Sequence, residues 1–229
     1  MLKIHNLHKT FKSTKILDGI SLEVEKSRIF GLAGPSGSGK STLLRCIQQL
    51  EVPDCGFLEC GGKTGFMFQD FQLFPHMTVL ENLLYATKFV DKKSNDKKES
   101  KKNHMHLAQN MLKKLSIEEK AGIYPRSLSG GQKQRVALAR SLMIDPDIFL
   151  CDEPTSGLDV ATIQDVVQLL KSVNEVGVTM IIASHDLDFL TKISDRIVLL
   201  KEGRIAVDID VRQQPDPAAY LKRFYAASS

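Results

Sequence analysis

A glycine-rich segment near the amino terminus limits the folds open to this 229-residue chain. Residues 34–42 have the sequence Gly-Pro-Ser-Gly-Ser-Gly-Lys-Ser-Thr, which matches the pattern G-x-x-x-x-G-K-[ST]. The apolar run Ile29 to Ala33 precedes this segment and is typical of a short buried strand, and Leu43 to Ile47 after it has helical character. A strand, a glycine loop and a helix in this order predict a loop that binds phosphate groups. The alternative, a chance glycine loop, does not account for the flanking strand and helix.

The residue types in this loop predict what it binds. Its glycines let several backbone N–H groups face one anion, and the helix that starts near Ser41 adds the positive end of its dipole. We expect the Lys40 ammonium to contact the β- and γ-phosphates of ATP, and the Ser41 hydroxyl to bind Mg²⁺. The candidate nucleotide-binding residues of the loop are Gly34, Pro35, Ser36, Gly37, Ser38, Gly39, Lys40, Ser41 and Thr42.

Composition excludes several other classes of protein. The length predicts one or two compact units, and a hydrophobic fraction of 42% is enough for a large core. No apolar run approaches the length of a membrane-spanning helix, and the amino terminus lacks the apolar stretch of a signal peptide. We therefore expect a cytosolic chain unless something else holds it at a membrane. The cysteines lack zinc-ligand spacing and are expected to be reduced thiols: Cys46, Cys55, Cys60 and Cys151.

The net charge of +4 is mild, and much of the positive excess lies in the lysine-rich run 88–102. Such a run is usually a solvated loop or helix end, although it could also be a basic patch for lipid headgroups or nucleic acid. The run lacks the aromatic residues of a single-strand binding platform. We therefore expect no nucleic-acid partner.

The order of apolar patterns predicts an α/β fold with a parallel sheet covered by helices on both faces. Residues 2–24 predict two or three antiparallel strands, and the glycines of 54–63 predict a hairpin region. From residue 70 to 128 the spacing is helical, which predicts an inserted helical subdomain between the two parts of a core, 1–69 and 129–229. After it, strands and helices alternate: helix 133–144, strand 148–151, helix 160–175, strand 179–183, helix 187–193, a hairpin over 196–209 and a surface helix over 217–226.

Two carboxylates end the apolar strand that begins at Ile148. An acidic residue at the end of a central strand, beside a phosphate loop, can hold Mg²⁺ through water, and we assign this role to Asp152. The next residue, Glu153, projects differently and could polarise a water for attack on the γ-phosphate. The alternative, two surface acids at a strand end, is weakened by the phosphate loop.

The pentapeptide Leu-Ser-Gly-Gly-Gln at 128–132 comes directly before a predicted helix. Ser129, Gly130 and Gly131 at a helix start form a second candidate anion site from free backbone N–H groups. One phosphate loop already surrounds one side of a triphosphate. A second site therefore makes sense if it covers the γ-phosphate from a facing subunit.

With these motifs, the chain resembles the ATP-binding subunits of ABC transporters over essentially its whole length. Residues 34–42 resemble Walker A, 128–132 with Gln132 resemble the signature motif, and 148–153 resemble Walker B with its general base. The resemblance implies a P-loop NTPase core of the RecA-like type, with an antiparallel β subdomain and a helical subdomain. It also implies a head-to-tail homodimer with two sandwiched nucleotides, in which Asp159 lies on the loop that crosses the interface.

The same resemblance implies roles for three further residues. Gln69 resembles the glutamine that touches Mg²⁺ or the attacking water, and His185 resembles the switch histidine at the γ-phosphate. Phe11 stands where this family places an aromatic ring on the adenine; a plain core phenylalanine is the alternative.

The segment 68–82 is similar to the same region in importers of polar amino acids, such as the glutamine type. The resemblance therefore implies an ATP hydrolase that energises import of a small polar solute through a membrane permease, with a solute-binding protein as an indirect partner. It places the chain in the cytoplasm, on the inner face of the cell membrane. Two alternatives stay open: the ATPase of a lipoprotein-release or cell-division complex, and a soluble ATPase that acts on nucleic acid or the ribosome.

Overall fold

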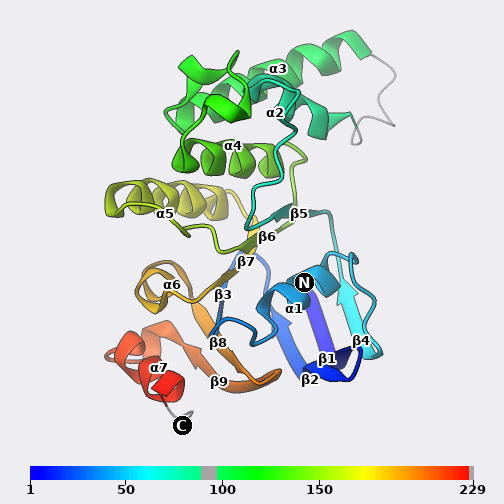
Figure 1. Ribbon diagram of the computed structural model, residues 1–229, viewed down its shortest axis with the longest axis vertical. Coiled ribbons are helices and arrows are strands. Elements are labelled where there is room, and N and C mark those ends of the chain that lie inside the picture. Colours follow the sequence, from blue (N-terminus) through cyan, green and yellow to red (C-terminus); the bar gives the residue numbers. More distant parts are fainter. Residues whose placement is uncertain (89–96, 227–229) are drawn as a thin grey trace.

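A six-stranded sheet forms the centre of this computed structural model, which describes residues 1–88 and 97–226 (Figure 1). All neighbouring strands are parallel except the last pair, β8 and β9, which forms the predicted carboxyl-terminal hairpin. The strands, in spatial order, are β5 (Thr64–Met67), β6 (Ile148–Asp152), β7 (Thr179–Ser184), β3 (Ile29–Ala33), β8 (Arg196–Lys201) and β9 (Arg204–Asp210). The predicted parallel sheet is confirmed, with one antiparallel strand at its edge.

Both faces of this sheet are buried, which explains why its central strands are continuous apolar runs. Along β6, Ile148 and Leu150 belong to one buried cluster, whereas Phe149 and Cys151 belong to the other. Alternation along the strand thus divides its side chains between two hydrophobic cores, one on each face of the sheet.

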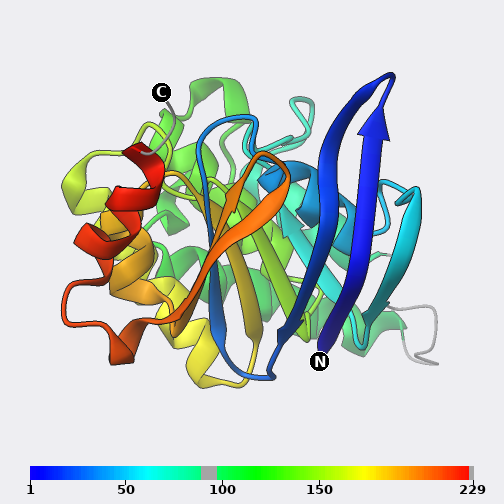
Figure 2. The ribbon, with the colours of Figure 1, turned by 90° about the horizontal axis from the view of Figure 1, so that it is seen from below.

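The two faces are covered differently. A second, antiparallel sheet in the order β2-β1-β4 stands beside the central sheet (Figure 2). Helix α1 (Lys40–Ile47) is sandwiched between the two sheets, since its Leu43 and Leu44 share a buried cluster with Leu2 and Leu150. The expected helical cover is therefore present on this face as α1, and the expected antiparallel β subdomain packs outside that helix. The new strands are β1 (Leu2–Phe11), β2 (Thr14–Val24) and β4 (Cys55–Cys60).

The hairpin predicted for residues 54–63 is absent from this segment. The segment contains the single strand β4, which pairs with β1, and the chain then crosses to β5 in the central sheet. Gly56 lets β4 approach β1 closely: its φ is +98°, and a Cβ atom there would collide with the backbone of Asn6 on β1. A glycine that predicts a turn can equally mark two strands that touch.

The remaining helices cover the other face of the central sheet and extend away from it (Figure 1). Helix α4 packs against the sheet at β5 and against α2 and α3 on its far side. In the described part of 70–128 the secondary structure is helical, as predicted, while 89–96 of the lysine-rich run lie outside the described residues. The helices are α2 (Val79–Thr87), α3 (Lys97–Lys114), α4 (Gly130–Leu142), α5 (Val160–Glu175), α6 (Leu187–Ile193) and α7 (Pro217–Ala226), with 3-10 turns at Glu118–Lys120, Pro125–Ser127 and Val211–Gln213.

Two further expectations can be compared with this architecture. The four cysteines are free thiols, as predicted. In the described ranges, no helix is both long enough and apolar enough to cross a membrane.

Candidate active site

The glycine loop joins the end of β3 to the start of α1, as its sequence predicts. Gly34 follows β3 with a φ of +153°, and a Cβ atom there would lie 2.5 Å from the carbonyl oxygen of Leu200. Only glycine fits this close approach of two backbones. Gly39 is the residue directly before α1, so the loop ends where the helix exposes its first N–H groups.

A pocket of about 340 Å³ opens beside this loop. Five segments far apart in the sequence contribute to it: the amino-terminal sheet, the glycine loop with α1, and the residues that follow β5, β6 and β7. Because these parallel strands end at the same edge of the sheet, their carboxyl ends meet there. The residues that line the pocket are Phe11, Ile16, Ser36, Gly37, Gly39, Lys40, Ser41, Thr42, Gln69, Glu153 and His185.

Lys40 holds a buried cation at the floor of the pocket. Its Nζ donates to the carbonyl oxygens of Gly34 at 2.7 Å and Pro35 at 3.1 Å, and lies 3.8 Å from Oε1 of Glu153. Burial lowers the pKa of Lys40, while the neighbouring carboxylates of Glu153 and Asp152 oppose this effect. The loop therefore folds back on its own lysine and places one positive charge where phosphates would enter.

Glu153 is a buried carboxylate in an unusual backbone conformation. Its φ is +53°, which lies in the left-handed region, and its N–H donates to the carbonyl oxygen of Ala183 at 2.9 Å. Its Oε2 accepts from the Ser184 hydroxyl at 3.3 Å and lies 2.9 Å from Nδ1 of His185. The change of conformation after β6 turns Glu153 toward the pocket.

Asp152 lies beneath the pocket and does not line it. Its side chain is buried, and burial raises the pKa of its carboxyl group, while a hydrogen bond with Ser41 opposes the rise. One of its oxygens, Oδ1, is buried and has no hydrogen-bond partner in the part of the chain that the structure describes. A buried carboxylate oxygen without a partner is costly, so Asp152 has spare capacity to accept from water or to bind a cation.

Two of the predicted contacts stand at the rim of the site. The Phe11 ring is 42% exposed, with Nζ of Lys9 at 5.0 Å from its centroid, so the alternative of a core phenylalanine is wrong. Gln69 lies two residues after the end of β5 and also lines the pocket. The pocket thus has an exposed aromatic ring near the amino-terminal sheet and polar side chains at the ends of the strands.

The predicted second anion site is not part of this pocket. Ser129 caps α4: its Oγ accepts from the N–H of Gln132 at 3.3 Å, and the Gln132 side chain accepts from the N–H of Ser129 at 3.0 Å. Gly130 and Gly131 form the first turn of α4. Asp159 caps α5, since its carboxylate accepts from the N–H and the hydroxyl of Thr162, each at 2.9 Å. Neither set lines the pocket of its own chain.

Sequence reasoning missed three residues around the site. Ile16 lines the pocket from β2, and Ser184 donates to Glu153 from the end of β7. Arg140 of α4 holds the loop after Gln69, because its guanidinium donates to the carbonyl oxygens of Phe71 at 2.9 Å and Gln72 at 2.7 Å. Ser184 could have been found from its place directly before His185, whereas nothing in the sequence links Arg140 to residues 71–72.

The chain matches proteins of known family. Residues 17–156 match the family model described as "ABC transporter". The "Arginine transport ATP-binding protein ArtM" of Bacillus subtilis is 41% identical, with 91% of this chain and 90% of that protein covered. The "Glutamine transport ATP-binding protein GlnQ" of Escherichia coli is 39% identical, with the same shares covered.

A solved structure supplies the corresponding match in three dimensions. It is the dimeric structure of a post-hydrolysis state of the ATP-binding cassette MJ0796 bound to ADP and Pi, with a TM-score of 0.84 and 33% identity. The alignment covers 93% of this chain and all of that one. The likeness therefore extends over most of the chain.

Proposed function

Because this chain belongs to the ABC transporter family and hydrolyses ATP, we propose that it energises the import of an amino acid through a membrane permease. The observation that carries the choice of solute is the match over about nine-tenths of the chain to proteins named for arginine and glutamine transport. We propose that ATP binds in the pocket that Phe11, Lys40 and His185 help to line.

We propose separate roles for four side chains of the pocket. Lys40 exchanges its contacts with the loop carbonyls for the β- and γ-phosphates, because a triphosphate offers a stronger acceptor than a neutral carbonyl. Glu153 accepts the proton of the attacking water as general base. His185 contacts the γ-phosphate, and Gln69 orients the water. These roles are supported by the place of all four side chains on one pocket.

Mg²⁺ fits the residues beneath the triphosphate. Two oxygen atoms are available as ligands: Oδ1 of Asp152, which has no partner among the described residues, and the hydroxyl oxygen of Ser41, which is hydrogen-bonded to the Asp152 carboxyl group. Mg²⁺ prefers oxygen ligands of this kind. We propose that Ser41, Asp152 and Gln69 hold the ion directly or through water. When bound, Mg²⁺ would offset the negative charge of the phosphates.

A second copy of the chain would complete the site. The Ser129–Gln132 segment and Asp159 lie at helix starts that do not line the pocket of their own chain. We propose a head-to-tail homodimer in which these segments cover the γ-phosphate bound by the partner. Support comes from the dimeric assembly of the matching cassette with ADP and Pi.

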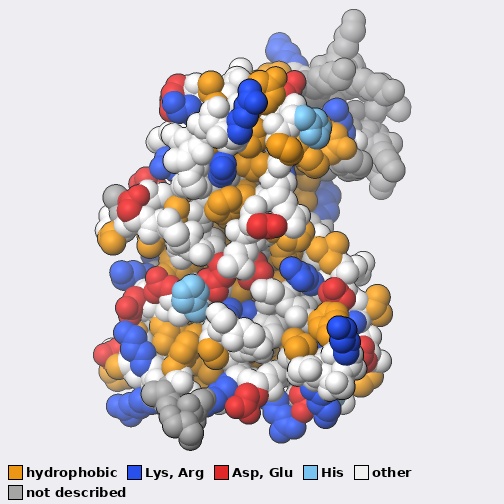
Figure 3. Space-filling view, in the orientation of Figure 1, with side chains coloured by type: hydrophobic (Ala, Val, Ile, Leu, Met, Phe, Trp, Pro, Cys, Tyr) orange, Lys and Arg blue, Asp and Glu red, His pale blue; other side chains and the backbone are white. Residues whose placement is uncertain are grey.

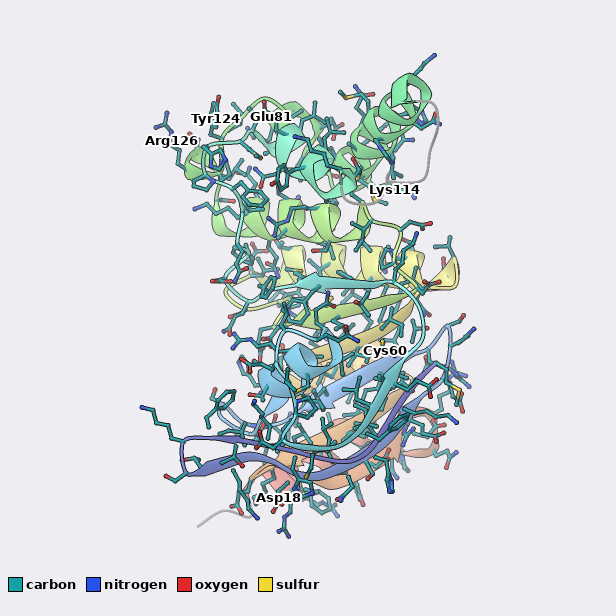
Figure 4. All side chains as sticks on the ribbon, turned by 90° about the vertical axis from the view of Figure 1, so that its right-hand side faces the viewer. Asp18, Cys60, Glu81, Lys114, Tyr124 and Arg126 are labelled. Carbon is teal, nitrogen blue, oxygen red and sulfur yellow. The ribbon has the colours of Figure 1, made fainter. Side chains whose placement is uncertain are left out.

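The helical part of the molecule is the proposed contact with the permease. In Figure 3, hydrophobic side chains gather on its surface, and Figure 4 shows Glu81, Tyr124 and Arg126 at its outer end, opposite Asp18. Tyr124 and its neighbour Ile123 are exposed, at 43% and 38%. We propose that 70–128 moves as a subdomain relative to 1–69 and 129–229, and that docking holds the chain at the cytoplasmic face of the cell membrane.

The first experiment tests the membrane partner. Glu153→Gln protein, with ATP and Mg²⁺, is used to purify partners from detergent-solubilised membranes of its own cell. Lys40→Ala protein serves as the control, because it should not form the ATP-bound homodimer. A multi-spanning partner enriched with Glu153→Gln is the expected result. Ribosomal or nucleic-acid components without a membrane protein would contradict the proposal.

The second experiment tests the solute. Uptake of labelled arginine, glutamine and cystine is compared in cells with and without this chain, with a labelled sugar as control. We expect the uptake of one or more of these amino acids to fall while sugar uptake is unchanged. If the first experiment finds a membrane partner but the uptake of arginine, glutamine and cystine is unchanged, the proposal of amino-acid import is contradicted. The proposal of a membrane permease would still stand.

A further inference from the structure

The carboxyl-terminal helix α7 touches the phosphate loop through one side chain. The hydroxyl oxygen of Tyr225 accepts a hydrogen bond from the N–H of Gly34, at 2.8 Å between the heavy atoms. The Tyr225 side chain is half-buried, and burial raises the pKa of its hydroxyl to about 12. This contact spans 191 residues of sequence, and no motif of the chain predicts it.

Gly34 connects this hydroxyl to the lysine of the pocket. The N–H of Gly34 is bound by Tyr225, and its carbonyl oxygen is bound by Nζ of Lys40 at 2.7 Å. The backbone of Gly34 packs so closely against Leu200 that a Cβ atom at Gly34 would lie 2.5 Å from the Leu200 carbonyl oxygen. The orientation of this one residue therefore fixes where the Lys40 ammonium rests before a nucleotide arrives.

Helix α7 itself is held at several points. It packs against α6 and β9, and Leu221 on its inner face is fully buried. The Lys222 ammonium lies 3.2 Å from the carboxylate of Asp188 on α6, and the rings of Tyr220 and Phe224 are 5.3 Å apart. A helix fixed in this way can act as a rigid support for the Tyr225 hydroxyl.

Helix α6 is also the element that follows His185. Asp186 caps its start by accepting from the N–H of Phe189 at 3.0 Å. Helix α7 thus contacts, on one side, the loop that holds Lys40 and, on the other, the helix that begins beside His185.

We propose that Tyr225 is a positioning residue of the ATPase: its hydroxyl holds Gly34 so that the phosphate loop is already shaped for ATP. The proposal goes beyond import and does not depend on which solute is carried. Without the hydroxyl, the N–H of Gly34 loses its partner, and part of the binding energy of ATP is spent on ordering the loop.

The test compares two phenylalanine variants of the same helix. Tyr225→Phe removes only the hydroxyl, and Tyr220→Phe is the matched control, because Tyr220 makes a ring contact through its aromatic carbons. The Kd for a fluorescent ATP analogue is measured with Mg²⁺, together with kcat and KM for hydrolysis and the thermal unfolding midpoint.

We expect Tyr225→Phe to raise the Kd and KM for ATP roughly three- to tenfold, the effect of one lost hydrogen bond, with kcat much less affected. Tyr220→Phe should leave Kd and KM unchanged. The proposal is overturned if Tyr225→Phe binds ATP as the unmodified protein does. It is also overturned if the two variants weaken ATP binding equally, or if Tyr225→Phe lowers only the unfolding midpoint.

Discussion

Oε2 of Glu153 and Nδ1 of His185 lie 2.9 Å apart, across the ends of the neighbouring strands β6 and β7. The two partners differ in exposure, because the Glu153 side chain is 9% exposed and the imidazole is 60% exposed. The carboxylate is therefore fixed by its surroundings, while the imidazole can turn toward a nucleotide. This arrangement gives the first prediction.

Glu153→Gln should slow ATP hydrolysis by about 10²- to 10⁴-fold, because an amide cannot take the proton of the attacking water. Its affinity for ATP should be retained, and a stable dimer should be seen by size-exclusion chromatography with ATP. Phosphate release is compared with that of Glu175→Gln, whose carboxylate is exposed at the end of α5. Hydrolysis at the rate of the unmodified protein would mean that the base lies elsewhere.

Lys40→Ala should weaken ATP binding by roughly ten- to hundredfold, the expected effect of losing hydrogen bonds from a charged donor. Binding is measured by titration with a fluorescent ATP analogue. Lys26→Ala removes an exposed lysine and should bind as the unmodified protein does. If Lys40→Ala retains full affinity, the loop does not hold the phosphates through this side chain.

Ser129→Arg should separate binding from hydrolysis. Its side chain lies outside the pocket of its own chain, so ATP affinity should be unchanged. Hydrolysis should be lost, because the long, positively charged arginine side chain would block the γ-phosphate site of the partner. Binding and phosphate release are measured on the same preparation; loss of ATP binding by the monomer would contradict an effect across a dimer interface.

The half-buried hydroxyl of Tyr225 predicts how stability changes at alkaline pH. Its pKa is about 12 in the folded chain and about 10 for an ordinary tyrosine. Between these values the unfolded chain gives up this proton while the folded chain keeps it, so the free energy of unfolding falls as pH rises.

Tyr225→Phe removes this contribution, and its loss of stability between pH ~9 and ~11 should be smaller than that of the unmodified protein. Urea unfolding at the two pH values measures the difference, with Tyr220→Phe as control. Equal losses in Tyr225→Phe and the unmodified protein would show that the hydroxyl titrates as in an unfolded chain.

Local patterns predicted most of the central sheet and the phosphate loop. The apolar runs 29–33, 148–151 and 179–183 became adjacent buried strands because residues that lie on two buried faces must nearly all be apolar. The cap of α5 by Asp159 was likewise predictable, since an N-cap depends only on its own helix.

Contacts between distant segments were not predictable in the same way. Nothing in residues 54–63 tells that β4 pairs with β1 in place of forming a hairpin, because both outcomes use the same glycines. The bonds of Arg140 to residues 71–72 and of Tyr225 to Gly34 depend on where whole helices come to rest. The sequence does not indicate the partner in any of these hydrogen bonds.

The position of β3 has a consequence for the synthesis of the chain. Its two neighbours in the sheet are β7 and β8, which begin at residues 179 and 196, whereas the loop that follows β3 starts at residue 34. Pairings between such distant segments form late, since a long loop must close first. A nascent chain that carries the whole glycine loop therefore cannot yet hold it in shape. Newly made copies should stay unable to consume ATP on the ribosome until nearly the entire chain has emerged.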